Sequence, residues 1–473
     1  MAIKFGTDGW RGIIADDFTF ENVRFCAQGV AQYLLGTGQA PRGLVVGYDT
    51  RFASEDFAAA VAEVMAGNGI KTILCDRSAP TPVVSYNIIT RAAAGAAIIT
   101  ASHNPARWNG FKFKPEYAGS ASPEVITALE DQIGRVEASR RVMLLPMSQA
   151  LHQGLVQHVE PKSAYLRHIG SLVDLEALKT AGLRIGLDAM YGAGAGYFPS
   201  LLNGGSTQVQ EIHGERNPLF PGMAQPEPVA HNLKGLTDLI TERSLDVGLA
   251  LDGDADRAGA VDEKGQFITP LQMFALLALY LLEVRGFRGP LVKSLTATSM
   301  IYRLGELYQV PVHETPVGFK YIGPIMLQEK AIIGGEESGG FGCGCHIPER
   351  DGILSNLFFI DLMVRTGKRP SELVQYLYEK TGQHHYQRED LIFPQGQREA
   401  VQKRVTQARP DALAGLPVLE RDTIDGVRFR LRGGAWLVVR FSGTEPLLRI
   451  YAEAESPQRA RELINAGRDI AGL

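Results

Sequence analysis

The chain has 473 residues, of which 45% are hydrophobic and 21% are charged, a composition typical of a globular protein with several domains of roughly 100–200 residues each. Its 48 Lys and Arg residues nearly balance its 52 Asp and Glu residues, so no overall basic charge is available to bind nucleic acid or an anionic membrane. Glycine is frequent, at 52 residues, which indicates many tight turns or places where the backbone approaches a ligand.

The cysteine content and the hydrophobic pattern indicate the compartment. Four cysteines occur, at Cys26, Cys75, Cys343 and Cys345. They are too few for a disulfide framework in a chain of this length, which favours a reducing compartment. The N-terminus lacks the apolar core of a signal peptide, and the longest apolar stretch, 273–284, is shorter than the ~18 residues of a membrane-spanning helix. We therefore expect a cytoplasmic protein with a buried helix at this stretch.

Short apolar runs alternate with helical patterns over most of the chain, which is typical of α/β layers with parallel strands. Central strands are predicted at 43–48, 95–99, 184–188, 246–251, 290–293 and 331–334. Helices are predicted between them, including 56–68, 123–137 and 270–285. Most of these strands end in polar or glycine-rich segments, where open α/β sheets bind their ligands.

The pattern changes near residue 382. Beyond it, 427–431 and 436–440 alternate like the two strands of a hairpin around 432–434. The sequence thus predicts three related α/β domains and a smaller C-terminal α+β domain around a central cleft. The predicted domains are 1–150, 151–258, 259–380 and 381–473.

The densest cluster of chemically active residues follows the strand predicted at 246–251. Asp252, Asp254 and Asp256 alternate with small residues, and Arg257 comes next. A turn at Gly253 lets three hard anionic oxygens converge on one divalent cation, and Mg²⁺ suits a site that keeps part of its coordination for water or phosphate. An acidic surface turn is the alternative, but the spacing after a buried strand favours a metal site. It is not an EF-hand, because the other loop ligands are missing.

A second polar turn, Thr100-Ala-Ser-His-Asn-Pro105, follows the strand predicted at 95–99. Ser102 at a strand end is placed as a nucleophile or phosphoryl carrier, although an ordinary hydrogen-bonded Ser/Asn turn has the same composition. Lys112, in the following segment, is a candidate for neutralising phosphate or for acid–base chemistry.

Three glycine-rich segments are candidates for binding anions or hydroxyl groups. Phe5–Gly12 contains Arg11, and Gly334–Gly340 offers carboxylates with a hydroxyl group. Arg440–Pro446, followed by Arg449, combines backbone amides, hydroxyl groups and guanidinium groups, which is the donor set that a phosphate dianion requires. A polar turn beside a surface arginine is the alternative interpretation of this last segment.

Other functions are less well supported. The turn Gly192-Ala-Gly-Ala-Gly196 after a strand, with Glu211 further on, imitates a dinucleotide fingerprint, but its third glycine is out of register, so an NAD-dependent dehydrogenase is only a distant alternative. Cys343-Gly-Cys-His346 has no partner pair at zinc spacing, which favours two free thiols.

Taken together, the motifs resemble the ordered signature set of the α-D-phosphohexomutases, the family of the phosphoglucomutases and phosphomannomutases. The motifs that carry the resemblance are Phe5–Gly12, Tyr48-Asp-Thr-Arg51, Thr100–Pro105, Asp252–Arg257, Gly335-Glu-Glu-Ser-Gly339 and Ser442-Gly-Thr-Glu-Pro446. They occur in the family's order and span nearly the whole chain. The resemblance implies an isomerase that interconverts hexose 1-phosphate and hexose 6-phosphate through a phosphoserine enzyme and a hexose 1,6-bisphosphate, and we expect glucose to be the preferred sugar.

The resemblance also implies a role for each matching residue. Ser102 is expected to carry the phosphoryl group and, with Asp252, Asp254 and Asp256, to hold Mg²⁺. The other residues expected at the reacting centre are Arg11, Arg257, Lys112 and His103, the last two as candidates for proton transfer. Those expected to bind the substrate are Thr315, Gly318, Lys320, Glu336, Ser338, Arg440, Ser442, Gly443, Thr444 and Arg449. A phosphorylated hexose is the expected partner, with no nucleic acid or membrane, and we favour a monomer.

Two positions depart from the family pattern. Position 340 is Gly where many members have histidine, and Phe441 replaces the more frequent proline. These positions concern sugar recognition and retention of the intermediate. A hexose 1,6-bisphosphate synthase that uses the same Ser102 and metal and releases the bisphosphate therefore remains the near alternative.

Overall fold

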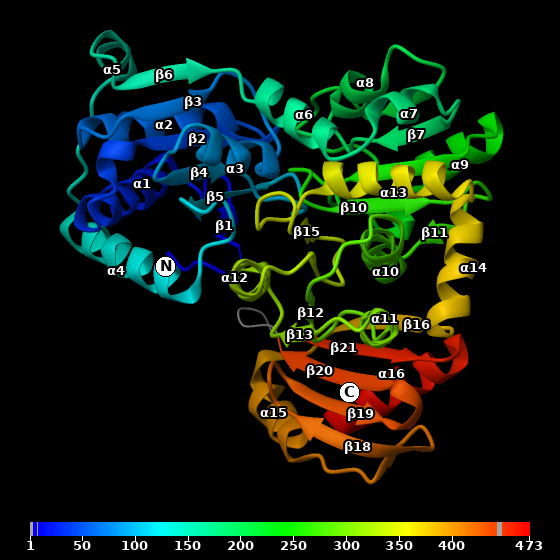
Figure 1. Ribbon diagram of the computed structural model, residues 1–473. Coiled ribbons are helices and arrows are strands. Elements are labelled where there is room, and N and C mark those ends of the chain that lie inside the picture. The colour runs from blue at the N-terminus through cyan, green and yellow to red at the C-terminus, as the bar shows by residue number, and fades with distance from the viewer. Residues whose placement is uncertain (1–2, 7, 442–446) are drawn as a thin grey trace.

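The computed structural model describes residues 3–6, 8–441 and 447–473. In this part of the chain four sheets form, each with its own helices, and they lie around a common centre (Figure 1). The first three sheets contain parallel strands and the fourth is antiparallel. The predicted fold class, three α/β domains followed by a smaller α+β domain, is confirmed. We refer to these units as domains I to IV, after their sheets in chain order.

Domain I has a six-stranded sheet in the order β1-β5-β4-β2-β3-β6. Its strands are β1 (Trp10–Ile13), β2 (Leu44–Tyr48), β3 (Thr72–Cys75), β4 (Gly95–Ile99), β5 (Trp108–Pro115) and β6 (Val156–Val159). Its helices are α1 (Phe20–Gly36), α2 (Ser54–Gly67), α3 (Thr81–Thr90), α4 (Pro123–Ser139) and α5 (Met147–His152). The central strand β4 is buried along its whole length, which explains its unbroken apolar sequence. Because β6 pairs with β3, this sheet continues past the boundary predicted at residue 150.

Domain II has a five-stranded sheet in the order β11-β10-β9-β7-β8. Its strands are β7 (Arg184–Asp188), β8 (Gln208–Ile212), β9 (Val247–Leu251), β10 (Ala258–Val261) and β11 (Phe267–Ile268). Its helices are α6 (Lys162–Ser171), α7 (Leu175–Thr180), α8 (Tyr197–Leu202) and α9 (Lys234–Arg243). Since β10 and β11 pair with each other and β10 pairs with β9, the sheet extends past the boundary predicted at residue 258.

Domain III has a four-stranded sheet in the order β13-β12-β14-β15. Its strands are β12 (Leu291–Ser294), β13 (Val312–Thr315), β14 (Ile333–Gly335) and β15 (Phe341–Cys343). Its helices are α10 (Pro270–Leu279), α11 (Met300–Tyr308), α12 (Phe319–Glu329), α13 (Gly352–Thr366) and α14 (Pro370–Thr381). A capping box at Thr269 and Gln272 starts α10, which continues as a π-helical turn over Tyr280–Val284.

The apolar stretch around α10 lies in the core, as the sequence predicts, because its side chains from Met273 to Leu282 are buried. Among the described helices, none has the length and hydrophobicity needed to cross a membrane.

Domain IV has a six-stranded sheet in the order β16-β21-β20-β19-β18-β17, with antiparallel pairing throughout. Its strands are β16 (His385–Ile392), β17 (Ala412–Leu413), β18 (Leu416–Asp422), β19 (Val427–Leu431), β20 (Trp436–Phe441) and β21 (Leu447–Ala454). Its helices are α15 (Arg398–Gln407) and α16 (Pro457–Ala471). The predicted hairpin of β19 and β20 is present, with a 3₁₀ turn at Arg432–Gly434 between the strands.

Three strands deliver the central loops. The carboxyl ends of β4, β9 and β14 lead into the segments that contain Ser102, Asp252 and Glu336. Domain III also packs directly on domain II, because the Asn356 amide on α13 donates to the main-chain oxygen of Ala250 in β9 over 2.9 Å. Loops that are distant in sequence therefore meet at one place between the domains.

Candidate active site

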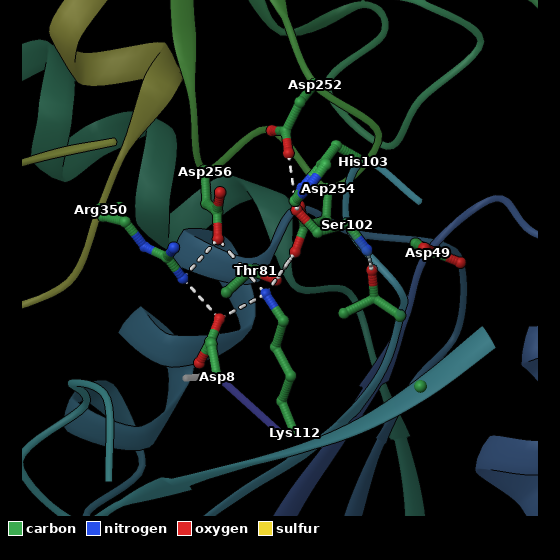
Figure 2. A network of polar contacts seen from close by, with 12 residues as sticks. Asp8, Asp49, Thr81, Ser102, His103, Lys112, Asp252, Asp254, Asp256 and Arg350 are labelled. Carbon is green, nitrogen blue, oxygen red and sulfur yellow. Dashed lines mark hydrogen bonds and ion pairs between the residues drawn. The ribbon is translucent and has the colours of Figure 1, made fainter. Parts of the chain in front are cut away.

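Ser102 lies at the carboxyl end of β4 with a left-handed backbone, φ = 53°, and is only 2% exposed. Its main-chain N–H donates to the Thr100 hydroxyl over 2.9 Å, which fixes the sharp turn. Its Oγ donates to Oδ2 of Asp252 over 2.7 Å (Figure 2). The structure thus joins the two motifs that the sequence placed 150 residues apart.

Arg51, whose side chain is fully buried, binds the turn that carries Ser102 through hydrogen bonds to its main chain. The Arg51 guanidinium donates to the main-chain oxygens of Ser102 and Asn104, each over 2.6 Å, and to those of Pro105 and Trp108, each over 3.0 Å. Its Nε lies 3.2 Å from Oδ2 of Asp49. The Tyr48–Arg51 motif therefore shapes the serine loop, a role that its sequence did not indicate.

Asp252, Asp254 and Asp256 converge as predicted. All three side chains are buried, and each offers one ligand oxygen within 4.8 Å of the others. Oδ1 of Asp254 and Oδ1 of Asp256 have no hydrogen-bond partner although both atoms are buried. Buried polar atoms are nearly always satisfied, so these unpaired oxygens fit a hard divalent cation bound between the carboxylates.

A glycine makes the approach of this aspartate loop to the serine loop possible. A Cβ atom on Gly253 would lie only 2.5 Å from the main-chain oxygen of Ser102. Any other residue at this position would push the two loops apart and separate Ser102 from the carboxylates.

The electrostatics of the aspartates support the same interpretation. Burial raises the pKa of Asp252 well above its ordinary value, and the charges of Asp254 and Asp256 raise it further. Burial acts on Asp254 too, but the charge and hydrogen bond of Lys112 and the hydrogen bond of Thr81 lower its pKa overall. Crowded carboxylates of this kind are relieved by a bound cation.

Lys112 is held as a cation among carboxylates (Figure 2). Its Nζ lies 2.7 Å from Asp8, 2.8 Å from Asp254 and 3.3 Å from Asp256. Burial alone would lower the pKa of Lys112, but these three charges outweigh burial and raise the pKa above its ordinary value. The geometry thus gives Lys112 a role in neutralising the aspartates, and the two roles that the sequence suggested for it, at phosphate and in proton transfer, stay predictions.

His103 has the opposite character. Its Nδ1 lies 3.4 Å from Oγ of Ser102. Burial lowers the pKa of His103 well below its ordinary value, and the positive charges of Arg257 and Arg11 lower it further. The imidazole is therefore neutral near pH 7 and able to accept a proton.

Arg350, which sequence analysis did not single out, is the main contribution of domain III to this network. Its Nη2 lies 2.8 Å from Oδ2 of Asp256, and the same nitrogen contacts Asp8. Gly340 is packed directly against this side chain, because a Cβ there would lie 2.4 Å from Cδ of Arg350. The departure from the family pattern at position 340 thus has a physical reason: Arg350 occupies the space.

A cavity of about 420 Å³ opens above these residues, and all four domains contribute to its wall. The predicted site residues that line it are Arg11, His103, Arg257, Gly318, Glu336, Ser338, Arg440 and Arg449. Asp8 of the Phe5–Gly12 motif also lines the wall. Other residues of the wall that the sequence did not indicate include Glu227, Arg350, Arg388 and Asp390. Thr315 and Lys320 are described by the structure but are not part of the wall. Ser442, Gly443 and Thr444 lie outside the described residues.

The two arginines of the predicted phosphate segment lie side by side. Arg440 on β20 is directly opposite Arg449 on β21, which places both on the same face of the sheet. Nε of Arg440 donates to Oδ1 of Asp425 over 2.8 Å, and Nε of Arg449 lies 3.5 Å from Oδ2 of Asp390. Two adjacent guanidinium groups facing a cavity are donors of the kind that a phosphate dianion requires.

Glu336, which also lines the cavity, is a weaker acid than an ordinary glutamate. Burial raises its pKa to about 7, although the positive charge of Arg350, with Nη1 at 3.8 Å, acts in the other direction. A carboxyl group poised in this way can accept hydrogen bonds from hydroxyl groups of a ligand when it is ionised.

Two features outside the cavity account for motifs that imitate other functions. The carboxylate of Glu211 accepts the N–H of Gly196 over 2.9 Å, so it closes the glycine-rich turn instead of facing a nucleotide. Cys343 and Cys345 are free thiols with their Sγ atoms 2.9 Å apart.

Comparison with known proteins decides the family. Four family models match in order: the phosphoglucomutase/phosphomannomutase alpha/beta/alpha domains I, II and III at residues 2–140, 163–265 and 269–381, and the C-terminal domain at 401–469. The chain belongs to the phosphoglucomutase/phosphomannomutase family. It is therefore an enzyme of intramolecular phosphoryl transfer, as the resemblance implied.

Relatives cover the whole length of this phosphohexomutase. A phosphoglucomutase/phosphomannomutase of Thermococcus kodakarensis is 31% identical over 99% of this chain and 98% of that protein. A phosphoglucosamine/phosphogalactosamine mutase of Sulfurisphaera tokodaii is 28% identical over 98% of each chain. The crystal structure of a protein from Thermus thermophilus is 35% identical and superposes with a TM-score of 0.86 over 100% of both chains.

Proposed function

We propose that this phosphohexomutase interconverts glucose 1-phosphate and glucose 6-phosphate through phosphorylated Ser102 and glucose 1,6-bisphosphate. The observation that carries the proposal is the 2.7 Å contact between Oγ of Ser102 and Asp252, at the edge of the buried aspartates and below the cavity that contains Arg440 and Arg449. It joins a phosphoryl carrier, a metal site and a phosphate-binding site in one place. The choice of a hexose phosphate follows the names of the relatives, which include glucose, mannose and hexosamine phosphates.

Asp252, Asp254 and Asp256 are the proposed ligands of Mg²⁺, together with an oxygen of phosphorylated Ser102. The unpaired buried oxygens of Asp254 and Asp256 fit this ion. When bound, Mg²⁺ supplies a Lewis acid that polarises the phosphoryl group and offsets its charge. Lys112 then keeps the excess negative charge of the aspartates balanced and holds their orientation.

The chemical step is an exchange of P–O bonds. The O6 or O1 hydroxyl of the sugar attacks phosphorus, the Ser102 Oγ–P bond breaks, and the hydroxyl proton passes by way of the neutral imidazole of His103 to the freed Oγ of Ser102, which becomes a hydroxyl again. Arg11 and Arg257, both in the cavity wall, offset the charge that develops on the transferring group. The reverse exchange at the other end of the sugar returns a phosphoryl group to Ser102 and restores the enzyme.

The phosphate that does not react is assigned to Arg440 and Arg449, with Ser442, Gly443 and Thr444 as further expected donors. Because the bisphosphate must reverse its orientation between the two steps, this site has to accept either phosphate. Glu336 and Ser338 on the facing wall are the proposed partners of the sugar hydroxyl groups. We call residues 315–320 the sugar-side loop. Roles for Thr315, Gly318 and Lys320 of this loop stay predictions.

The comparisons give no support to a hexose 1,6-bisphosphate synthase, the near alternative from the sequence. An assay separates the two. Purified enzyme is incubated with Mg²⁺, a trace of glucose 1,6-bisphosphate and, in separate reactions, the 1-phosphates of glucose, mannose and glucosamine, and all products are identified by NMR. We expect clean conversion to the 6-phosphate, fastest for glucose. A synthase needs a phosphoryl donor to recharge Ser102, so it would leave most of the 1-phosphate unconverted and would release bisphosphate only up to the amount of phosphoryl groups that the enzyme and the added trace supply.

Replacing the proposed phosphoryl carrier tests the mechanism directly. Ser102→Ala is expected to lower kcat by about 1000-fold or more. The exposed Ser171→Ala serves as the matched control and is expected to behave like the wild type. Peptide mass spectrometry is expected to find phosphate on Ser102 after incubation with glucose 1,6-bisphosphate, and a Ser102→Ala enzyme with wild-type kcat would show that the proposal is wrong.

A further inference from the structure

Domain IV contacts domain III along one face of its sheet, and this contact separates two cavities. Its centre is an apolar cluster of Leu295, Trp436, Val438 and Tyr451, with Val317 packed against it. On one side lies the cavity of about 420 Å³ that contains Arg440 and Arg449. On the other side lies a cavity of about 590 Å³ between the two domains, lined in part by Glu314 and Arg430. Domain IV therefore contacts domain III through this apolar cluster, which we call the apolar ridge, and a cavity lies on either side of it.

The side away from the active site is fastened by charged groups. Glu314 of domain III accepts hydrogen bonds from Arg428 over 2.7 Å and from Arg430 over 3.0 Å, both on β19. At the start of α11, the main-chain N–H of Ser299 donates to Glu453 on β21 over 2.8 Å. Arg428 and Glu453 are buried, so the bonds from Arg428 to Glu314 and from Ser299 to Glu453 are shielded from water and hold the two domains firmly at this edge.

The active-site side depends on Asp425. This residue lies in the turn between β18 and β19, next to Gly426, whose φ of 93° reverses the chain. One carboxylate oxygen accepts Nε of Arg440 over 2.8 Å, and the other accepts the main-chain N–H of Val317 in domain III over 3.1 Å. Val317 and Arg440 both line the active-site cavity.

We propose that Asp425 is a positioning residue that couples the phosphate-binding arginine Arg440 to the sugar-side loop at Val317 and so holds domain IV closed over a hexose bisphosphate. The proposal rests on the proposed function of the site. The Asp425 carboxylate aims the Arg440 guanidinium at the phosphate with one oxygen and ties domain IV to Val317 of domain III with the other. Loss of the bond to Val317 frees domain IV to tilt on the apolar ridge into the space of the second cavity.

The asymmetry of the two edges explains why Asp425 is the releasable contact. Glu314 binds two guanidinium groups of domain IV, whereas Asp425 binds a single main-chain N–H of domain III, which water replaces readily. The bisphosphate has to reverse its orientation without escaping, so the site must loosen briefly and close again. The weak bond from Asp425 to Val317 on the active-site side lets the site loosen, and the strong bonds of Glu314 at the other edge keep domain IV attached so that the site can close again.

The test compares Asp425→Ala with Ile424→Ala, a control in the same turn whose side chain is 51% exposed. Turnover of glucose 1-phosphate is followed together with the bisphosphate released into solution. For Asp425→Ala we expect KM and released bisphosphate each to rise by about fivefold or more while kcat stays within about twofold. Asp425→Asn keeps one acceptor oxygen, so its KM and its release of bisphosphate are expected to lie between those of Asp425→Ala and those of the wild type. Wild-type KM and bisphosphate release in Asp425→Ala would overturn the proposal.

A distance measurement tests the same residue without turnover. Spin labels are placed at Gln328 on α12 and Gln402 on α15, both exposed, in a background with the partly exposed Cys345 replaced by Ser. Asp425→Ala is expected to broaden the distribution of distances between the labels, and Ile424→Ala to leave it unchanged. An unchanged distribution in Asp425→Ala would also overturn the proposal, whereas a wild-type enzyme that converts no hexose phosphate would contradict the proposed function alone.

Discussion

The buried guanidinium of Arg51 donates to the main-chain oxygen of Ser102 over 2.6 Å, and three further carbonyl groups of the same loop accept from it. One side chain from the loop after β2 therefore sets the backbone of the loop after β4. The left-handed conformation of Ser102 is costly for a residue with a side chain, and these bonds help to maintain it.

Arg51→Lys tests whether the serine loop needs the planar geometry of the guanidinium group or only its positive charge. An ammonium group keeps the positive charge but cannot reach four carbonyl groups in the directions that a planar guanidinium reaches. We expect kcat to fall by about 100-fold because Ser102 is displaced from Asp252. The free energy of unfolding, measured in urea, should fall by about 1–3 kcal/mol for the carbonyl groups left unsatisfied. Unchanged kcat in this variant would show that Arg51 is not needed to hold the loop.

The metal site predicts a response that can be measured without substrate. Mg²⁺ is expected to raise the Tm of the wild type, because an ion that binds the folded protein alone stabilises it. Asp254→Asn should raise the Mg²⁺ concentration needed for this shift, and for activity, by about 10-fold or more. Chelation with EDTA should abolish activity, and added Mg²⁺ should restore it.

Asp238→Asn on α9, an exposed residue paired only with Lys234 nearby, is a suitable control for that experiment. A Tm that does not respond to Mg²⁺ in the wild type would contradict the assignment of the aspartates as metal ligands.

Glu336 predicts a pH dependence of substrate binding. The charged groups that act on it are Arg350, Glu337, Arg257 and Asp256. Burial raises its pKa to about 7, so the carboxylate that accepts sugar hydroxyl groups is progressively lost as the pH falls below 7. We expect KM for glucose 1-phosphate to rise from pH 8 to pH 6 in the wild type. Glu336→Gln should remove this inflection, and a variant that retains it would show that another group is responsible.

The same shift has a consequence for stability whose sign is opposite to that of an ordinary ion-paired carboxylate. The pKa of Glu336 is about 7 in the folded protein, above its ordinary 4.5. Its contribution to stability is thus complete below pH 4.5 and is lost as the pH rises through 7. Glu336→Gln is expected to be more stable than the wild type at pH 8, as judged by its urea midpoint.

Gly340→His tests the packing of Arg350. A side chain at position 340 meets Cδ of Arg350 at 2.4 Å, so the guanidinium has to leave Asp256 and Asp8. We expect a loss of activity of about 10-fold or more, with partial recovery when Arg350→Ala is added, because neighbouring substitutions of this kind are not additive. Full activity in Gly340→His alone would show that the Arg350 contacts are dispensable.

Short motifs carried much of the prediction from sequence. Ser102 and Asp252 each follow a buried strand within a compact pattern, which makes both recognisable in the sequence. Their strands β4 and β9 lie in different sheets, so only the family resemblance implied that the two residues meet. Asp8 lies within the Phe5–Gly12 motif, but the motif does not indicate its contacts. Arg350 could not be predicted, because it belongs to no motif and its contacts with Asp8 and Asp256 cross domain boundaries. The position of Gly340 was noted, but its cause is a contact with a side chain ten residues later in the chain.

The sugar-side loop shows another limit. Thr315 ends β13 with its side chain buried, and its hydroxyl donates to the main-chain oxygen of Pro316 over 2.8 Å. The loop presents Val317, Gly318 and Phe319 to the cavity. Which residues of a loop face a site depends on backbone angles such as the φ of 124° at Gly318, and these are not encoded in a motif.

The network of Asp8, Lys112, Asp256 and Arg350 has a consequence for recombination between relatives. Domain I supplies Asp8 and Lys112, domain II supplies Asp256, and domain III supplies Arg350. A chimera in which a relative's domain replaced one of these three domains would leave buried charges without their partners, unless the incoming domain carried the same residues at the positions of the network. Domain IV contributes nothing to this network among its described residues, so a crossover near Gly382 would exchange the phosphate-binding half of the cavity and leave the reacting centre intact.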